Sequence, residues 1–228
     1  GLPEVRDYTT ALTRKFIQEW DFDGHKLDNI YTMPACYNPA HRHADTQESV
    51  RGFAEIYRQI FEITRQLKPN SVTQICPCGA TLTHTLIPAT DQTVTADPTS
   101  SAQVRQRIKF YKGLMGPRSA VFADHVELSD GGADFASCFG AGGVLSTKFI
   151  HPLDDAVKTR LKEYWALTND KESLWKKWFD VAAQHSLADG EYLNLYDLAF
   201  DFPEAHVIRK DDSMYYAFFA QSYAGQIQ

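Results

Sequence analysis

The stretch that decides the expected fold is residues 22–28, FDGHKLD, together with residues 93–101, TVTADPTSS. Each is expected to form a short strand that ends near a carboxylate, which is Asp28 in the first stretch and Asp97 in the second. The C-terminal ends of parallel strands meet at one rim of a β/α barrel, and barrel active sites lie at that rim. The sequence therefore predicts a barrel that presents two aspartates at the same rim.

On either side of these stretches, short β-branched runs alternate with amphipathic segments. The short runs predict strands at residues 22–27, 71–76, 93–96 and 120–124 and inside 140–150. Apolar residues spaced three or four apart predict helices at residues 5–20, 49–67, 101–114 and 154–167. Strands that alternate with helices at this spacing predict a parallel α/β sheet.

The number of these units predicts an incomplete barrel. A closed (β/α)8 barrel of the TIM type has eight units, so the visible units are expected to be strands 4 to 8, within residues 1–185. Residues 186–228 change to short alternating runs such as HVIRK and MYYAFFAQSY, which predict the beginning of a C-terminal antiparallel β-sandwich domain. The chain is therefore expected to be part of a longer protein. Alternatively, it forms a homo-oligomer or binds a partner chain that covers the open barrel edge.

Composition limits the classes of protein to which the chain can belong. Its 228 residues are 43% hydrophobic and carry a formal net charge of −6, without the Lys and Arg clusters that suit a nucleic-acid partner. No apolar run approaches the ~20 residues that span a bilayer, and the first residues, GLPEVRDYTT, do not resemble a signal peptide. Four cysteines in a chain of this size predict reduced thiols. These features leave the compartment open.

The two aspartates are candidates for paired acid chemistry. Lys26 lies two residues before Asp28, so both side chains point to one side of a strand, and an ammonium group favours an ionised nucleophile. A structural Lys-Asp pair would show the same pattern. Asp97 precedes Pro98 at a strand end, where it could donate a proton to a leaving oxygen or cap the next helix. Carboxyl groups ~5–5.5 Å apart would predict glycoside hydrolysis with retention, and ~6.5–9.5 Å would predict inversion.

Five motifs together resemble one known family. HKLD, CPCG, ADPTSSAQVRQR, ADHVE and ASCFGAGG occur in this order, at residues 25–28, 76–79, 96–107, 123–127 and 136–143. This series resembles glycoside hydrolase family 36, the melibiase or α-galactosidase family, over nearly the whole chain. The resemblance implies a retaining exo-glycosidase that hydrolyses terminal α-galactosides or related α-glycosides, with no metal or organic cofactor.

The resemblance also implies roles for individual residues. Asp28 would be the nucleophile and Asp97 the acid/base. The implied substrate-binding residues are Lys26 for a sugar hydroxyl, Cys76 and Gly79 for the 2-position of the sugar, Arg105 in support of the acid/base segment, and His125 beneath the sugar. The chain has Leu27 where many relatives have Trp, and a shorter CPCG loop, so the sugar preference does not follow directly.

Two alternatives stay open at this stage. The chain could be a non-catalytic fragment or subunit that binds sugar or needs a partner chain. It could also be a metal-dependent hydrolase on a barrel, since His41 and His43 have a ligand-like spacing, although a loop that contacts sugar hydroxyls ranks above this. The residues that could complete such a metal site are His25, His125, Cys76 and Cys78. Trp178 and Phe179 are interpreted as packing residues rather than a sugar platform.

Overall fold

The computed structural model describes residues 2–28, 33–77, 82–124, 133–146, 172–195, 203–222 and 224–226. The chain divides into two compact units, Gly1–Val94 and Thr95–Gln228. The helix expected at residues 154–167 lies outside the described residues, as do Gly79 and His125. The predicted domain boundary between residues 185 and 186 stays a prediction.

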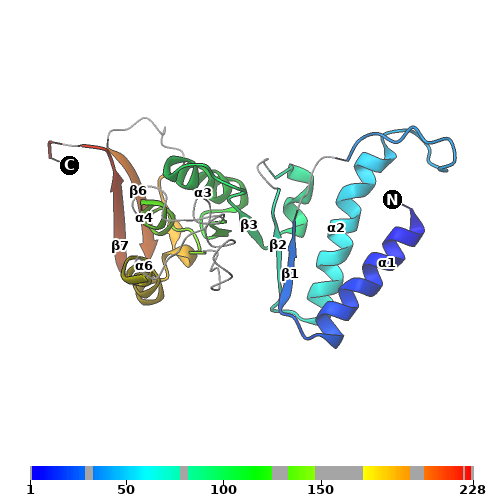
Figure 1. The fold of residues 1–228 in the computed structure, drawn as a ribbon, viewed down its shortest axis with the longest axis horizontal. Coiled ribbons are helices and arrows are strands. Elements are labelled where there is room, and N and C mark those ends of the chain that lie inside the picture. The colour runs from blue at the N-terminus through cyan, green and yellow to red at the C-terminus, as the bar shows by residue number, and fades with distance from the viewer. Residues whose placement is uncertain are drawn as a thin grey trace, which may run out of the picture. The chain divides into compact units, whose positions relative to one another are not determined.

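The first unit is a parallel sheet covered by two helices. Helix α1 (Pro3–Arg14) continues as a π-helix (Lys15–Glu19), and α2 is Glu48–Leu67. Figure 1 shows α1 and α2 side by side, on the same side of β1 and β2. The remaining elements are β1 (Gly24–Leu27), β2 (Val72–Ile75), the 3-10 helix η2 (His84–Ala89) and β3 (Gln92–Val94).

The strands of the first unit pair in parallel, as the sequence predicts. Leu27 pairs with Ile75, and Ile75 pairs with Thr93 on its other side. Gly24 begins β1 at a φ of +151°, and a Cβ atom there would lie 1.9 Å from the Val72 carbonyl oxygen. Only glycine therefore allows β1 to begin this close to β2.

The second unit contains a helical layer and an antiparallel sheet. Its helices are α3 (Ser101–Met115), α4 (Ala133–Gly140), α6 (Glu172–His185) and the 3-10 helix η4 (Leu187–Asp189). Its strands are β4 (Ala120–Phe122), β5 (Glu191–Tyr192), β6 (Glu204–Lys210) and β7 (Ser213–Phe219), of which β5, β6 and β7 form an antiparallel sheet. The antiparallel strands expected from residue 192 onward are confirmed.

The parallel pattern continues at the beginning of the second unit. Thr95, which follows β3 directly, donates its backbone N–H to the Phe122 carbonyl of β4 at 2.9 Å. Phe122 also pairs in parallel with Val144, inside the segment that was expected to hold a fifth strand. The structure is therefore an α/β fold with parallel and antiparallel sheets, and closure into a barrel stays a prediction.

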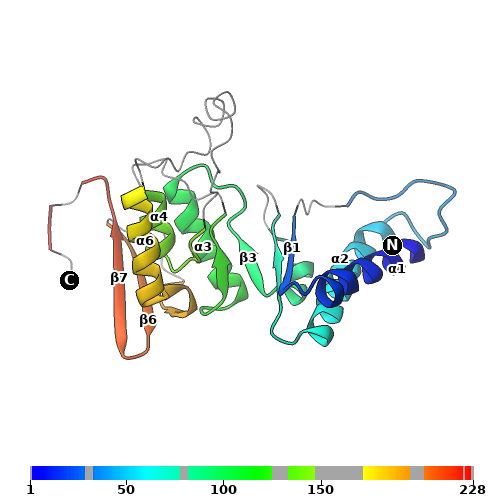
Figure 2. The same cartoon turned by 60° about the horizontal axis from the view of Figure 1, so that its bottom comes forward.

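Helix α4 is an element that the sequence analysis missed, as is α6. It packs against β7 in the second unit (Figure 2). The packing is close, because a Cβ atom on Gly140 would lie 2.7 Å from the Cβ atom of Ala217. Small residues at the end of α4 thus permit the helix to approach the sheet.

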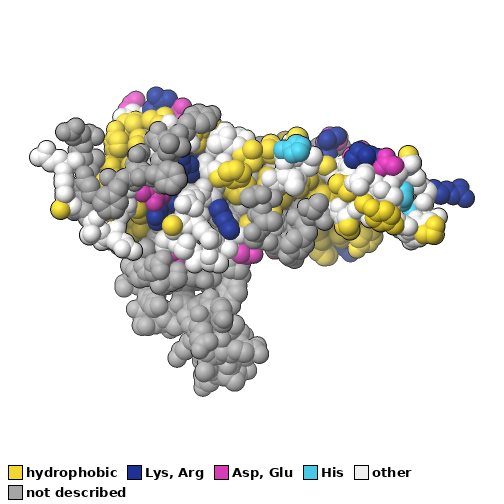
Figure 3. Space-filling model, turned by 90° about the horizontal axis from the view of Figure 1, so that it is seen from above, with side chains coloured by type: hydrophobic (Ala, Val, Ile, Leu, Met, Phe, Trp, Pro, Cys, Tyr) yellow, Lys and Arg dark blue, Asp and Glu magenta, His cyan; other side chains and the backbone are white. Residues whose placement is uncertain are grey.

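Within the described parts of the chain, no helix combines the length and the apolar character that crossing a bilayer requires. On the face that Figure 3 presents, the visible Lys and Arg side chains are scattered rather than gathered in one patch.

A charged network joins α3 to the antiparallel sheet within the second unit. The Arg105 guanidinium donates Nε and Nη2 hydrogen bonds to the Glu204 carboxylate at 2.9 and 2.6 Å, and it lies 4.3 Å from the centre of the Phe219 ring. His206 Nε2 lies 2.8 Å from the same carboxylate, and His206 Nδ1 lies 2.6 Å from the Tyr192 hydroxyl. Both His206 and Tyr192 are buried. The network therefore joins the helix to the sheet through a partly buried carboxylate.

The Glu204 carboxyl is strongly acidic for this reason. Burial by itself would raise the pKa of Glu204, but hydrogen bonds from His206 and Arg105 and the positive charge of Arg105 lower this pKa from 4.5 to about 2. A carboxyl with a lowered folded-state pKa stabilises the fold above its unfolded-state pKa. That stabilisation is lost as the pH falls from about 4.5 towards 2.

We predict that Glu204→Gln reduces the pH dependence of stability in this range. In the unsubstituted protein, Glu204 is expected to contribute about 3 kcal/mol to the free energy of unfolding at pH 7, and this contribution should vanish near pH 2. Chemical denaturation between pH 7 and pH 2 measures the difference. Asp212→Asn, an exposed carboxylate in the turn between β6 and β7, is the matched control. An acid-dependent loss of stability that is the same in Glu204→Gln and in the unsubstituted protein would contradict the assignment.

Candidate active site

Lys26 and Asp28 lie together at the C-terminal end of β1. Lys26 belongs to the strand and Asp28 follows it directly, and Lys26 Nζ lies 3.9 Å from Asp28 Oδ2. This distance confirms the prediction that the side chains of Lys26 and Asp28 point to the same side of the strand. Their side chains are 39% and 46% exposed, so the pair is too open to be a buried structural ion pair. The Asp28 carboxylate can therefore be approached by a substrate in this unit.

Cys76 lies beside this pair. Its backbone N–H donates to the Leu27 carbonyl at 2.8 Å, which continues the parallel pairing of Leu27 with Ile75. Cys76 therefore begins the loop after β2 at the strand end where Asp28 begins the loop after β1. The Cys76 side chain is 1% exposed, so Cys76 contributes mainly backbone and packing to this edge.

Asp97 follows β3 in a left-handed backbone conformation, which it shares with Ala96. Ala96 and Asp97 have φ angles of +57° and +52°, in the left-handed region that costs a non-glycine residue ~1 kcal/mol or more. The surrounding structure must hold such a segment in place, and strained segments of this kind concentrate at functional sites. Asp97 lies in the second unit and Asp28 in the first, so their convergence at one rim stays a prediction.

Arg107 holds the strained segment. Its Nη1 atom donates to the Thr95 carbonyl at 2.7 Å and also to the Ala96 carbonyl. Both of these residues are buried, and the Thr95 hydroxyl in turn donates to the Asp124 carbonyl at 3.2 Å. A charged donor on two adjacent carbonyls fixes the backbone directly before Asp97.

The sequence analysis assigned support of this segment to Arg105. The structure instead pairs Arg105 with Glu204 and with the Ser137 hydroxyl, to which its Nη1 atom donates at 2.8 Å. Residues two apart on a helix point in opposite directions, so Arg105 and Arg107 cannot serve the same side of α3. The spacing therefore indicates that one of the two arginines at most supports the segment, but it does not decide which one. A role for Arg105 in substrate binding stays a prediction.

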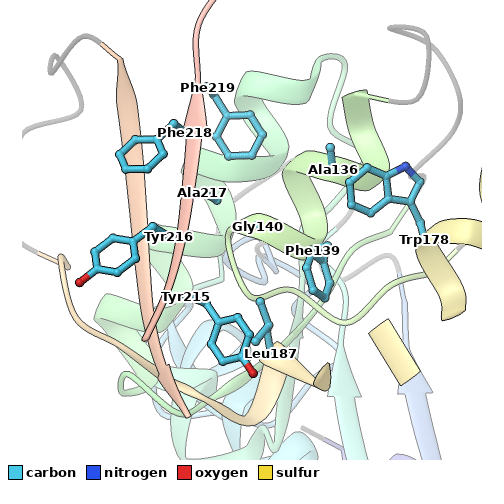
Figure 4. A pocket seen from close by; sticks show the side chains of 10 residues that line it. All are labelled: Ala136, Phe139, Gly140, Trp178, Leu187, Tyr215, Tyr216, Ala217, Phe218 and Phe219. Carbon is cyan, nitrogen blue, oxygen red and sulfur yellow. The ribbon is translucent and has the colours of Figure 1, made fainter. Parts of the chain in front are cut away.

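One hollow in the second unit is largely apolar. It lies between α4, α6 and β7 (Figure 4), and its lining side chains include no carboxylate, Lys, Arg or His. Ring centres of Phe139 and Trp178 are 6.1 Å apart, and those of Phe135 and Phe179 are 6.2 Å apart. These ring contacts agree with the interpretation of Trp178 and Phe179 as packing residues, and Trp178 also lines the hollow. The hollow offers no carboxylate for paired acid chemistry.

The loop between β1 and α2 contains residues that could hold a metal ion. These are Cys36, His41 and His43, with their ligand atoms within 4.8 Å of one another. The spacing of the two histidines suggested such a site, but Cys36 was not recognised as its third member. His25 and Cys76, which were considered instead, do not belong to this group.

The fold and the site together describe an α/β protein whose polar side chains lie where parallel strands end. The chain is similar to a protein of Flavonifractor plautii described as "A type blood alpha-D-galactosamine galactosaminidase", with 38% identity over 204 residues. The match covers 89% of this chain and 17% of that protein, so the chain spans less than a fifth of the relative's length. No model of a known protein family matches the chain.

We predict that Arg107→Met destabilises the segment before Asp97. Without the Arg107 guanidinium, the buried carbonyls of Thr95 and Ala96 lose their charged hydrogen-bond donor. This loss should lower the free energy of unfolding by about 2 kcal/mol. Gln106→Met, an exposed position on the same helix, is the control and should change stability by less than ~0.5 kcal/mol. Denaturant unfolding of both variants measures this, and equal stabilities would show that Arg107 does not hold the segment.

Proposed function

We propose that the chain carries the catalytic aspartates of a retaining glycosidase of family 36. The observation that carries this proposal is the exposed Lys26–Asp28 pair at the end of a parallel strand, next to Cys76. Sequence similarity to a galactosaminidase over 89% of the chain supports a glycosidase independently of this structural observation. Because the chain spans only 17% of that relative, the rest of the barrel would come from further polypeptide or from a partner chain.

The proposed reaction is a double displacement. Asp28 attacks the anomeric carbon, and the bond between this carbon and the leaving oxygen breaks while Asp97 gives that oxygen its proton. Water then attacks the glycosyl-enzyme ester, and Asp97 takes the proton of that water. The sugar leaves with its anomeric configuration retained, and both carboxyls return to their first state.

The proposed substrates carry a terminal α-linked galactose or a close derivative. The name of the F. plautii relative points to α-galactosamine, which differs from galactose at the 2-position. The resemblance to family 36 implies that Cys76 and Gly79 would line that position of the sugar. We therefore expect this loop to decide between a hydroxyl and an amino group, and the nitrophenyl α-galactoside and α-galactosaminide are the substrates with which to compare turnover.

We predict that Asp28→Asn abolishes this turnover while the fold stays intact. Removal of the nucleophile should reduce kcat by more than ~10³-fold. Asp23→Asn is the matched control, because Asp23 lies just before β1 as Asp28 lies just after it, and its carboxylate is exposed and pairs with Lys68. Asp23→Asn should retain the activity of the unsubstituted protein.

Two outcomes would overturn the proposal. Hydrolysis of the nitrophenyl α-glycosides by Asp28→Asn at the unsubstituted rate would exclude Asp28 as the nucleophile. Absence of hydrolysis in the unsubstituted protein, accompanied by galactose or galactosamine binding in calorimetry, would instead support the alternative of a sugar-binding subunit.

A further inference from the structure

We propose that the loop between β1 and α2 binds a zinc ion through Cys36, His41 and His43. This site uses other residues than the proposed acid pair and needs no assumption about glycoside hydrolysis. It is defined by a thiol and two imidazoles from a short stretch of chain, which is a donor set that zinc prefers.

The distances between the donor atoms suit a shared ion. Cys36 Sγ lies 3.2 Å from His41 Nδ1, and the three ligand atoms lie within 4.8 Å of one another. A sulfur and a nitrogen bound to one tetrahedral zinc ion, at ~2.3 Å and ~2.0–2.1 Å, lie ~3.6 Å apart. Small side-chain rotations would therefore bring the group to coordination distance.

His43 supplies the observation that points most directly to a ligand. Its Nε2 atom is buried and has no hydrogen-bond partner. A buried polar atom without a partner costs ~1–3 kcal/mol, so such atoms are normally satisfied. A metal ion bound at Nε2 would give this atom a partner.

The loop has a defined shape before any ion binds. The Cys36 N–H donates to the Thr46 carbonyl at 2.8 Å, which closes the segment that contains all three ligands. The Ser49 hydroxyl donates to the Pro34 carbonyl at 2.7 Å, and the Ala44 N–H donates to the Glu48 carboxylate at 2.7 Å. These bonds attach the loop to the first turn of α2 and reduce the entropy cost of assembling a site.

Asn38 provides a specific way to test the role of His41. Its Oδ1 accepts from the Ala40 N–H at 3.0 Å, so its Nδ2 faces His41 Nε2 at 3.1 Å and donates to it. This arrangement leaves the imidazole proton on Nδ1, beside Cys36. A zinc ion at Nδ1 would displace that proton and require Nε2 to become a donor. Asn38→Asp should therefore strengthen zinc binding, because a carboxylate can accept from both Ala40 and His41.

The donor chemistry selects the class of metal. Thiolate and imidazole ligands suit zinc and neighbouring transition metals, whereas calcium and magnesium prefer oxygen ligands. Three protein ligands leave one tetrahedral position for solvent or another group. The described residues of this cluster supply three ligands, so the site is expected to be of the open kind.

The test is titration of the purified protein with zinc and, as a spectroscopic probe, with cobalt(II). One zinc ion per chain should bind, and cobalt should produce the charge-transfer absorption of a thiolate ligand. Cys36→Ser and His43→Gln should weaken zinc binding by more than ~100-fold, and Asn38→Asp should strengthen it by ~10-fold. His84→Gln removes an exposed histidine of the same unit and should leave binding unchanged.

Several results would overturn the zinc proposal. These are absence of stoichiometric binding, bound cobalt without the thiolate band, or equal loss of binding in Cys36→Ser and His84→Gln. Circular dichroism of each variant separates loss of a ligand from loss of the fold. The gain expected for Asn38→Asp keeps the test decisive if Cys36→Ser does not fold.

Discussion

The parallel pairing of β1 and β2 is the constraint on which the candidate site depends. The hydrogen bond from the Cys76 N–H to the Leu27 carbonyl continues that pairing to the last residue of β1. Side chains that follow parallel strands must then leave the sheet at one edge, and Asp28 does so beside Cys76. Gly24 permits this pairing at the other end, because a side chain there would collide with the backbone of β2.

In the second unit, opposite sides of α3 contact two different parts of the structure. Arg107 fixes the backbone before Asp97, while Arg105 binds Glu204 on the antiparallel sheet. The same helix therefore positions the proposed acid and attaches the β6–β7 hairpin. In the first unit, the loop that follows β1 and Asp28 contains the proposed zinc ligands. A bound zinc ion would restrict the conformation of this loop.

Much of the secondary structure could be predicted from the sequence, because local periodicity determines it. The helices at Glu48–Leu67 and Ser101–Met115 and the strands at Val72–Ile75 and Ala120–Phe122 lie within a few residues of the expected bounds. Helix α4 was missed because it has only eight residues, ADFASCFG, which are mostly small and lie between two glycine-containing stretches. The partners of Arg107, Arg105 and Cys36 could not be predicted, since tertiary contacts rather than residue spacing decide them.

The central claim is that two aspartates from different strands act on one sugar. The most direct measurement is a crystal structure of the protein that carries this sequence, with galactose or galactosamine bound. The account predicts that the carboxyl groups of Asp28 and Asp97 lie ~5–5.5 Å apart, on either side of the anomeric carbon. Carboxyl groups at opposite ends of the strands, or farther apart than the ~9.5 Å that any paired glycosidase mechanism allows, would contradict it.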